Sequence, residues 1–505
     1  MNAWTLAGGM VNFLGDEPPL LLEIPPSLCS LMPLSVPDPD ENEVRPHVRW
    51  FGPAMLLAAA GLFFAVRRLL PLHEETLATG GLNGDRVRDG LAILSVTAFL
   101  WLTEALPVSA TALLIPLMAV FFTGSRVESA LAPFADPVLF LFFGGFVIAG
   151  TLRHHGLDRW LAGRLIAAAH GRFTVAALLM ILATAVISMW ISNTATAAMM
   201  LPLALGMAAK LELPAAERRR AEVFLLLGIA FAASVGGVGS LVGTPPNGVV
   251  AQALQLEFND WFRFGLPAFA LFLPALLAIL LGFFRPSFSW RIPAETSAWR
   301  WTLPRILTLL VFAGVILAWL FSAPLAALLG KPKNFDTVVA LCGVAAVCLL
   351  RLLPWKELER SVEWGVLLLF GGGLLLGRLL EETGASVFLA RGFTVMTGGW
   401  PLVLLLLGLA AAVTLLSEFA SNTAVATLMV PVFSKVALEM GLPPEKLVVP
   451  VGLAASCGFM MPVATPPNAL VFGTGKVPQR DMIRCGLLLD AACVLCIGLL
   501  GWLVF

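Results

Sequence analysis

The sequence contains no tyrosine, only five histidines, and few charged residues for a chain of 505 residues. Asp, Glu, Lys and Arg make up 13% of the chain, whereas an ordinary soluble protein carries roughly 25%. So little charge cannot cover the surface of a soluble protein of this size. Lysine plus arginine equals aspartate plus glutamate at 32 each, which excludes the basic excess expected of a nucleic-acid-binding protein.

The chain also lacks the clusters that enzymes and metal centres use. The seven cysteines lie mostly in apolar runs. Cys493 and Cys496 form a CxxC, but no histidine or second cysteine pair is near them. We therefore expect the cysteines to be buried packing residues. No group of His, Asp or Cys gathers inside an apolar run, so we do not expect an enzyme.

Long apolar runs dominate what the sequence does contain. Hydrophobic residues make up 59% of the chain, and the mean hydropathy is +0.90. A membrane helix needs about 20 mostly apolar residues, and runs of this kind recur from residue 50 to residue 505. The pattern predicts an all-α polytopic protein in a lipid bilayer. Residues 1–47 are rich in Pro and acidic residues and predict a loose cytoplasmic tail, followed by an extra transmembrane helix and loop in 48–88.

Three motifs recur in the same order, 221 to 229 residues apart. They are Phe-Gly-Gly at 143–145 and 370–372, Ser-Asn-Thr at 192–194 and 421–423, and Thr-Pro-Pro-Asn at 244–247 and 465–468. This predicts two repeats, 89–285 and 303–505, with a linker at 286–302. We count five crossings and one hairpin in each, so the second repeat is inverted. The whole chain then has about 11 spans and two hairpins.

Four apolar runs are interrupted by polar motifs. The runs 174–208 and 402–434 are too long for one span and carry Ser-Asn-Thr midway, which predicts re-entrant hairpins. The runs 222–254 and 447–472 carry Thr-Pro-Pro-Asn, and the prolines predict helix breaks near Gly243 and Ala464. A broken helix leaves N–H groups that suit a carboxylate and C=O groups that suit sodium. Because the motifs contain no Lys or Arg, a bound anion needs a mobile cation, either sodium or a proton.

The interrupted runs resemble those of a known family. The stretches 188–202, 418–423, 243–247, 461–468 and 135–145 look like those of the divalent anion/sodium symporters, solute carrier family 13. The resemblance covers roughly residues 89–505. It implies a homodimer in which a transport domain moves past a scaffold domain by an elevator-type mechanism. Short amphipathic helices, here about 157–170 and 385–397, would be the connecting arms.

The resemblance also implies a set of site residues. The first sodium site would use Ser188, Ser192, Asn193 and Gly243, and the second would use Ser417, Ala420, Asn422 and Ala464. The substrate carboxylates would meet Ser192, Asn193, Thr194, Thr244, Pro245, Ser421, Asn422, Thr423, Thr465 and Pro466. The expected function is sodium-coupled symport of C4-dicarboxylates such as succinate, malate and fumarate. The alternatives are a sodium-independent exchanger of dicarboxylate or 2-oxoglutarate, a citrate or sulfate carrier, and a channel.

The distribution of cations predicts the orientation. Most Lys and Arg fall in segments that are cytoplasmic if the N-terminus is inside, which favours a cytoplasmic N-terminus and an external C-terminus in a bacterial inner membrane. The four arginines between 67 and 88 argue against this assignment. Among single residues, Asp136-Pro137 predicts a helix start. Glu418 either bonds local backbone or acts on the second sodium site.

Overall fold

The computed structural model describes residues 46–71, 82–292, 300–330 and 333–503. The expected tail at 1–47 lies almost wholly outside the described residues, as does part of the expected linker. The chain divides into two units, Met1–Phe51 and Gly52–Phe505. Everything below concerns the second unit. Its described part is helical apart from one isolated bridge between Arg172 and Arg291, so the expectation of an all-α fold is confirmed.

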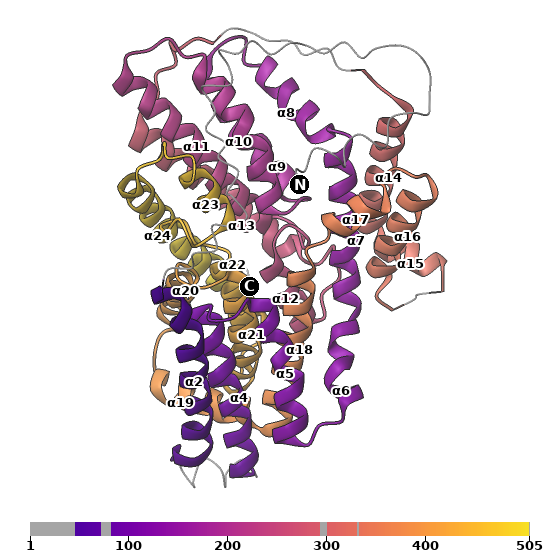
Figure 1. The fold of residues 1–505 in the computed structure, drawn as a ribbon, viewed down its shortest axis with the longest axis vertical. Helices are drawn as coiled ribbons and strands as arrows, with labels where there is room; N and C mark the ends of the chain where they lie inside the picture. The colour runs from indigo at the N-terminus through magenta and orange to yellow at the C-terminus, as the bar shows by residue number, and fades with distance from the viewer. Residues whose placement is uncertain (1–45, 72–81, 293–299, 331–332, 504–505) are drawn as a thin grey trace, which may run out of the picture. The chain divides into compact units, whose positions relative to one another are not determined.

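The helices follow one another along the whole chain (Figure 1). The first group is α2 (Pro46–Leu69), α4 (Gly84–Thr103), α5 (Val108–Met118), a π-helical turn (Ala119–Thr123), α6 (Val127–Leu131), a 3-10 turn (Ala132–Ala135), α7 (Pro137–His154) and α8 (Leu157–Ala167). Next come α9 (Phe173–Ser188), α10 (Asn193–Ala209), α11 (Ala215–Val238), α12 (Pro245–Leu254) and α13 (Phe262–Phe284). Then follow α14 (Leu303–Leu320), α15 (Ser322–Leu328), α16 (Phe335–Leu349), α17 (Trp355–Ser361), α18 (Trp364–Thr383) and α19 (Ala385–Thr397). The last are α20 (Leu402–Ser417), α21 (Asn422–Glu439), α22 (Glu445–Ala455), α23 (Pro466–Phe472) and α24 (Gln479–Leu503).

Several of these helices are long and apolar enough to cross a membrane. Among the described residues six qualify by length and composition: Val127–His154, α11, α13, α14, α18 and α24. Six more apolar helices of 10–17 residues include α9, α10, α16 and α20. The chain is therefore a multi-pass membrane protein. The count of about 11 spans and the inverted order of the repeats stay predictions.

All four interruptions fall on the motifs that predict them. Between α9 and α10 the helix stops for residues 189–192, and between α20 and α21 it stops for 418–421. Between α11 and α12 the break covers 239–244, and between α22 and α23 it covers 456–465. Proline occupies the first two positions of both α12 and α23, where a helix needs no N–H donor. The predicted start at Asp136-Pro137 is also confirmed, because Asp136 Oδ1 accepts from Val138 N at 3.0 Å and caps α7.

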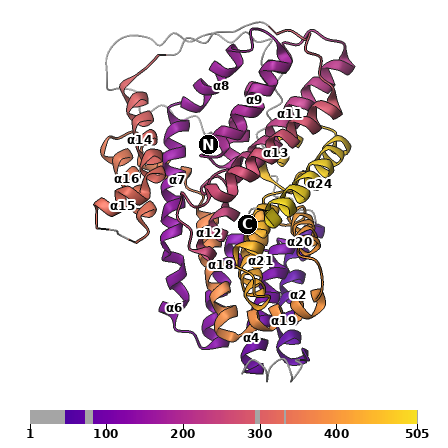
Figure 2. The same ribbon diagram turned by 180° about the vertical axis from the view of Figure 1, so that it is seen from behind.

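Helix α11 lies at the centre of the core. Its apolar stretch is completely buried inside the protein, and it packs against α9, α10, α13 and α23. Gly236 permits the closest approach, because a Cβ there would overlap the backbone of Ala185 on α9. Helices α9, α10 and α11 therefore run side by side, as Figures 1 and 2 show. This packing fixes the first hairpin against the first broken helix.

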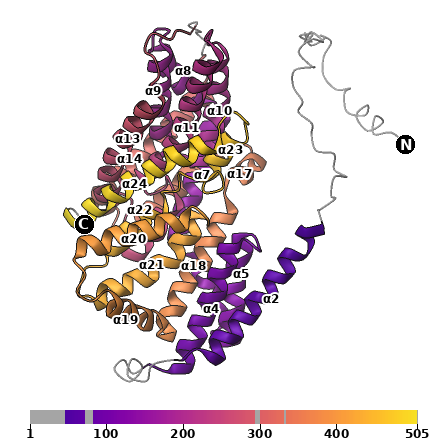
Figure 3. The same ribbon diagram turned by 90° about the vertical axis from the view of Figure 1, so that its left-hand side faces the viewer.

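The second hairpin is held in the same manner. Helix α22 packs against α20, α21 and α24, and Figure 3 shows these four helices as neighbours. Each hairpin also reaches the other half of the chain, because α10 packs against α23 and α12 packs against α21. Phe231 of α11 and Phe459 of the second break meet edge to face, with ring centroids 5.4 Å apart. The four interruptions therefore gather in one region.

Candidate ion and substrate site

Oxygen atoms converge on the Asn193 side chain at the tip of the first hairpin. Ser188 is fully buried, and its Oγ lies 2.8 Å from Asn193 Oδ1 and 2.7 Å from Ala233 O. The same edge of the amide lies 2.9 Å from Ala233 O and 3.3 Å from Gly243 O. In the absence of a cation, the amide nitrogen turned to this side would donate to all three oxygens. With the amide oxygen turned there instead, four oxygens face one point, which is an arrangement that a hard cation prefers.

The second hairpin tip places equivalent residues together. Ser417 is fully buried and its Oγ donates to Ala455 O at 3.0 Å. Around Gly458 the chain brings Ser417 O, Asn422 Oδ1 and Ala464 Cβ close, since a Cβ at Gly458 would lie 3.4, 3.7 and 3.3 Å from them. Asn422 Oδ1 is buried and has no hydrogen-bond partner among the described residues. A buried amide oxygen without a donor is costly, and a bound cation would satisfy it.

One asparagine stabilises each helix break. Asn247 Nδ2 donates to Gly237 O at 2.9 Å and to Ser240 O at 2.7 Å. Asn468, which lies 221 residues later, donates to Gly458 O at 3.2 Å and to Met461 O at 3.0 Å. Both side chains are fully buried. Because the breaks leave backbone carbonyls without helical partners, these amides keep the interruptions in a fixed conformation.

The expected substrate residues differ in exposure. Ser192, Asn193, Thr194, Ser421, Asn422 and Pro245 are partly exposed, Pro466 is exposed, and Thr244, Thr423 and Thr465 are buried. Thr465 caps α23, because its Oγ1 accepts from Asn468 N at 3.3 Å. Ala420 is buried beside the second tip. The hairpin tips therefore present polar groups to an accessible space, while the threonines of the breaks lie behind them.

Two ties between hairpin and break were not apparent from the sequence. Glu418 is fully buried, and its carboxylate accepts from Met460 N at 2.8 Å and from Met461 N at 2.7 Å. Of the two expectations for Glu418, the geometry agrees with the one that bonds it to local backbone. In the first half, Ser240 Oγ donates to Met189 O. The 229-residue and 221-residue offsets relate these two pairs and were the signal that could have found them.

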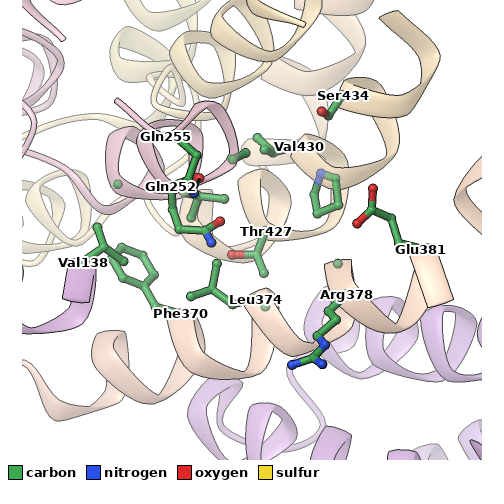
Figure 4. A pocket seen from close by; sticks show the side chains of 16 residues that line it. Val138, Gln252, Gln255, Phe370, Leu374, Arg378, Glu381, Thr427, Val430 and Ser434 are labelled. Carbon is green, nitrogen blue, oxygen red and sulfur yellow. Dashed lines mark hydrogen bonds between the residues drawn. The ribbon is translucent and has the colours of Figure 1, made fainter. Parts of the chain in front are cut away.

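A cavity of about 260 Å³ lies among α7, α12, α18 and α21 (Figure 4). Its polar lining includes Gln252 and Gln255 of α12, Arg378 and Glu381 of α18, and Thr427 of α21. Arg378 Nε donates to Glu382 at 2.7 Å, so its charge is already paired. Helices α12 and α21 begin at the Pro245 and Asn422 motifs. The cavity therefore borders the helices that start at the candidate site.

The cysteines require no function. Cys457, Cys485 and Cys493 are buried and Cys496 is partly buried, all as free thiols. Cys342 and Cys348 are exposed on α16, where the expectation of burial is wrong. That surface belongs to an apolar helix, so an exposed cysteine there is compatible with lipid. Among the described residues no group of three His, Cys, Asp or Glu could hold a metal ion.

Comparisons with known proteins agree with this architecture. The chain matches the family described as "Citrate transporter" (CitMHS) over residues 98–433 and 337–505. An uncharacterized transporter of Haemophilus influenzae is 42% identical over 88% of this chain and 95% of its own length. The sodium-dependent dicarboxylate transporter SdcS of Staphylococcus saprophyticus is 30% identical over 79% of this chain and 82% of its own length.

A solved structure supports the fold alone. The crystal structure of the Alcanivorax borkumensis YdaH transporter aligns with 90% of this chain and 96% of its own, at a TM-score of 0.50 and 16% identity. Together with the family match and the apolar helices, this shows a membrane transporter and not an enzyme. The chain belongs to the citrate transporter family and, with it, to the divalent anion/sodium symporters.

Proposed function

We propose that this chain is a sodium-coupled symporter of C4-dicarboxylates such as succinate, malate and fumarate. The observation that carries the proposal is the set of oxygens around Asn193, together with the unpartnered buried Oδ1 of Asn422. Amide, hydroxyl and backbone oxygens are ligands that sodium accepts. The sodium dependence of the SdcS relative points the same way.

We assign the ion sites to the two hairpin tips. Ser188, Ser192, Asn193 and Gly243 would hold the first sodium ion, and Ser417, Ala420, Asn422 and Ala464 the second. The dicarboxylate would bind between the tips, at Ser192, Asn193, Thr194, Thr244, Pro245, Ser421, Asn422, Thr423, Thr465 and Pro466. The free N–H groups at the starts of α10, α12, α21 and α23 face anions favourably.

Charge balance explains the coupling. The motifs around both tips contain no Lys or Arg, so a dianion placed there alone would lose its hydration without compensation. Two sodium ions offset its two charges. Sodium binding first therefore completes the site, and only the neutral, loaded protein crosses the membrane at low cost.

The movement we propose is of the elevator type in a homodimer with two inverted repeats. The two hairpins and broken helices would form the moving domain, and α8 and α19, which coincide with the expected arms, would connect it to the scaffold. The polar cavity beside α12 and α21 would be the path of the substrate on one side. The N-terminus would be cytoplasmic and the C-terminus external in a bacterial inner membrane.

A second candidate substrate is citrate, because the matching family carries that description. Citrate bears a third carboxylate, and two Ser-Asn-Thr tips satisfy two of the three. A sodium-independent exchange of dicarboxylate or 2-oxoglutarate, and a sulfate carrier, are the remaining alternatives. All of these transport modes differ from a channel in showing counterflow and saturation.

Uptake of labelled succinate into proteoliposomes tests the proposal. We expect uptake to require an inward sodium gradient, to fail with potassium or a proton gradient alone, and to be inhibited by malate more strongly than by citrate or sulfate. Asn193→Ala and Asn422→Ala should each abolish sodium-driven uptake. Asn259→Ala is the matched control, because Asn259 is an exposed asparagine in the loop after α12.

Two outcomes would contradict the proposal. Sodium-independent uptake at the full rate would rule out symport. Wild-type rates in both asparagine variants, each folded as judged by its melting temperature, would show that the site lies elsewhere.

A further inference from the structure

A second cavity, of about 870 Å³, lies far from the hairpin tips. It is bordered by the residue that follows α10, by the start of α11, and by the end of α13 with its following loop. Four cations line it, Lys210, Arg220, Arg285 and Arg291, against the two carboxylates of Glu212 and Glu217. Helix α10 separates Lys210 from Asn193 by 17 residues, which is about 25 Å along a helix axis. This cavity is therefore distinct from the candidate transport site.

The wall that carries two of the arginines is a built structure. The loop 285–292 is fixed to the start of α9 by Phe173 N to Trp290 O and by Ile292 N to Gly171 O, both at 3.0 Å. Thr174 Oγ1 also donates to Ser287 O at 2.6 Å. Backbone pairing of this kind holds a segment more firmly than side-chain contacts do. Arg285 and Arg291 are thus presented from a defined backbone.

The cations of this cavity lack counter-ions of their own. Arg220, Arg285 and Arg291 form no salt bridge with any residue that the structure describes, whereas their neighbour Arg218 pairs with Glu222 at 3.3 Å. One of the two carboxylates is already in use, because Trp290 Nε1 donates to Glu217 Oε2 at 3.2 Å. Glu217 also sits in the first turn of α11, where the helix dipole adds positive potential. An anion entering the cavity would relieve this repulsion.

We propose that this cavity binds a phosphate-bearing anion. Guanidinium groups match phosphate oxygens with paired N–H donors, and the hydroxyls of Ser287 and Ser289 line the same cavity as further donors. The cavity lies where apolar helices end, which is the level of phospholipid headgroups. The shared chemistry admits two sources, an anionic phospholipid headgroup or free inorganic phosphate. The inference does not depend on sodium coupling or on the transported substrate.

The alternative role for these cations is orientation in the membrane, which needs charge but no ligand. Binding measurements separate the two roles. The full-length protein, purified in a neutral detergent, would be titrated with phosphatidylglycerol, with phosphatidylcholine, and with inorganic phosphate. Native mass spectrometry counts bound lipid, and the shift of the melting temperature gives the apparent affinity for each probe.

Three variants complete the experiment. Arg285→Gln with Arg291→Gln removes both loop charges, and Arg285→Lys with Arg291→Lys retains them. The matched control is Arg126→Gln with Lys333→Gln, two cations outside the lining of this cavity. A charge-assisted hydrogen bond contributes about 1.5–3 kcal/mol, and 1.4 kcal/mol is tenfold in affinity. The Gln pair should therefore weaken binding by roughly tenfold or more, while the Lys pair and the control stay within about threefold.

Each result has a definite meaning. Arginine-dependent binding of phosphatidylglycerol but not of phosphate identifies a lipid headgroup site, and the reverse identifies a soluble anion; both support the proposal. Binding of neither probe, or equal affinity in the wild type and the Gln pair, overturns it. Should the Gln pair lose its folded melting transition, the Lys pair with Ser287→Ala and Ser289→Ala takes its place. Unchanged affinity there would also count against the proposal.

Discussion

Gly237→Ala should disable the first sodium site while leaving the fold intact. Gly237 lies at the end of α11, facing the tip of the first hairpin. A Cβ there would lie 3.0 Å from Asn193 Nδ2, 3.1 Å from Asn193 Cγ, and closer still to Oδ1. The amide has to move, because the opposing backbone of α11 is helical and fixed.

The displacement has a calculable cost. A shift of about 1 Å restores ordinary van der Waals separation but breaks the contacts of Asn193 with Ser188 Oγ and Ala233 O. One lost hydrogen bond is worth about 1 kcal/mol, and a buried polar group left unpaired costs about 1–3 kcal/mol. Two lost contacts amount to about 2–4 kcal/mol, which lowers sodium affinity about 30-fold or more. Alanine favours a helix over glycine by about 1 kcal/mol, so the helix itself is not weakened.

The repeat supplies the control. Gly458 lies 221 residues after Gly237, and a Cβ there meets only Ala464 Cβ at 3.3 Å, Ser417 O at 3.4 Å and Asn422 Oδ1 at 3.7 Å. These are ordinary or slightly tight contacts, so Gly458→Ala should change sodium half-saturation of succinate uptake by less than about threefold. The sodium dependence of uptake into proteoliposomes measures both. The reasoning is refuted if Gly237→Ala keeps its sodium half-saturation, or if Gly458→Ala loses as much.

Three further predictions concern stability, measured as melting temperature in detergent. Glu418→Ala should lower it by the equivalent of about 2–4 kcal/mol, because two backbone N–H groups lose a charged acceptor; an unchanged midpoint would contradict this. Glu222→Ala should lower it by about 1–2 kcal/mol, since Glu222 pairs with Lys476 at 2.9 Å and Arg218 is half-exposed. Burial lowers the pKa of His155 below 6.5, against the opposing bond to Leu352 O. Its contribution to stability is therefore complete above pH 6.5 and declines as the pH falls toward the lowered pKa; His155→Gln should remove that part of the decline.

Local effects were predictable from the sequence. The prolines after Thr244 and Thr465 and the Ser-Asn-Thr triplets determine where helices stop, because each acts on its own backbone within one turn. The ends of α9, α11 and α20 accordingly fall at these motifs. The same reasoning predicted Asp136 as the cap of α7.

Contacts between distant segments were not predictable. Ser188 meets Ala233 across 45 residues, and Ile292 meets Gly171 across more than 100. Nothing in the composition of either segment specifies its partner, since a backbone carbonyl is the same at every residue. The cavity beside Arg285 depends on such a pairing, and a run of arginines alone was read as an orientation signal.

The two halves fasten hairpin to helix break with opposite chemistry. In the first half a side chain of the break, Ser240, donates to a backbone carbonyl of the hairpin at Met189. In the second half a side chain of the hairpin, Glu418, accepts from backbone N–H groups of the break. The second tie therefore adds a buried negative charge beside Ser417, which the first tie lacks. Two sites built from the same motifs consequently differ in electrostatics, so the second tip should attract its cation more strongly than the first.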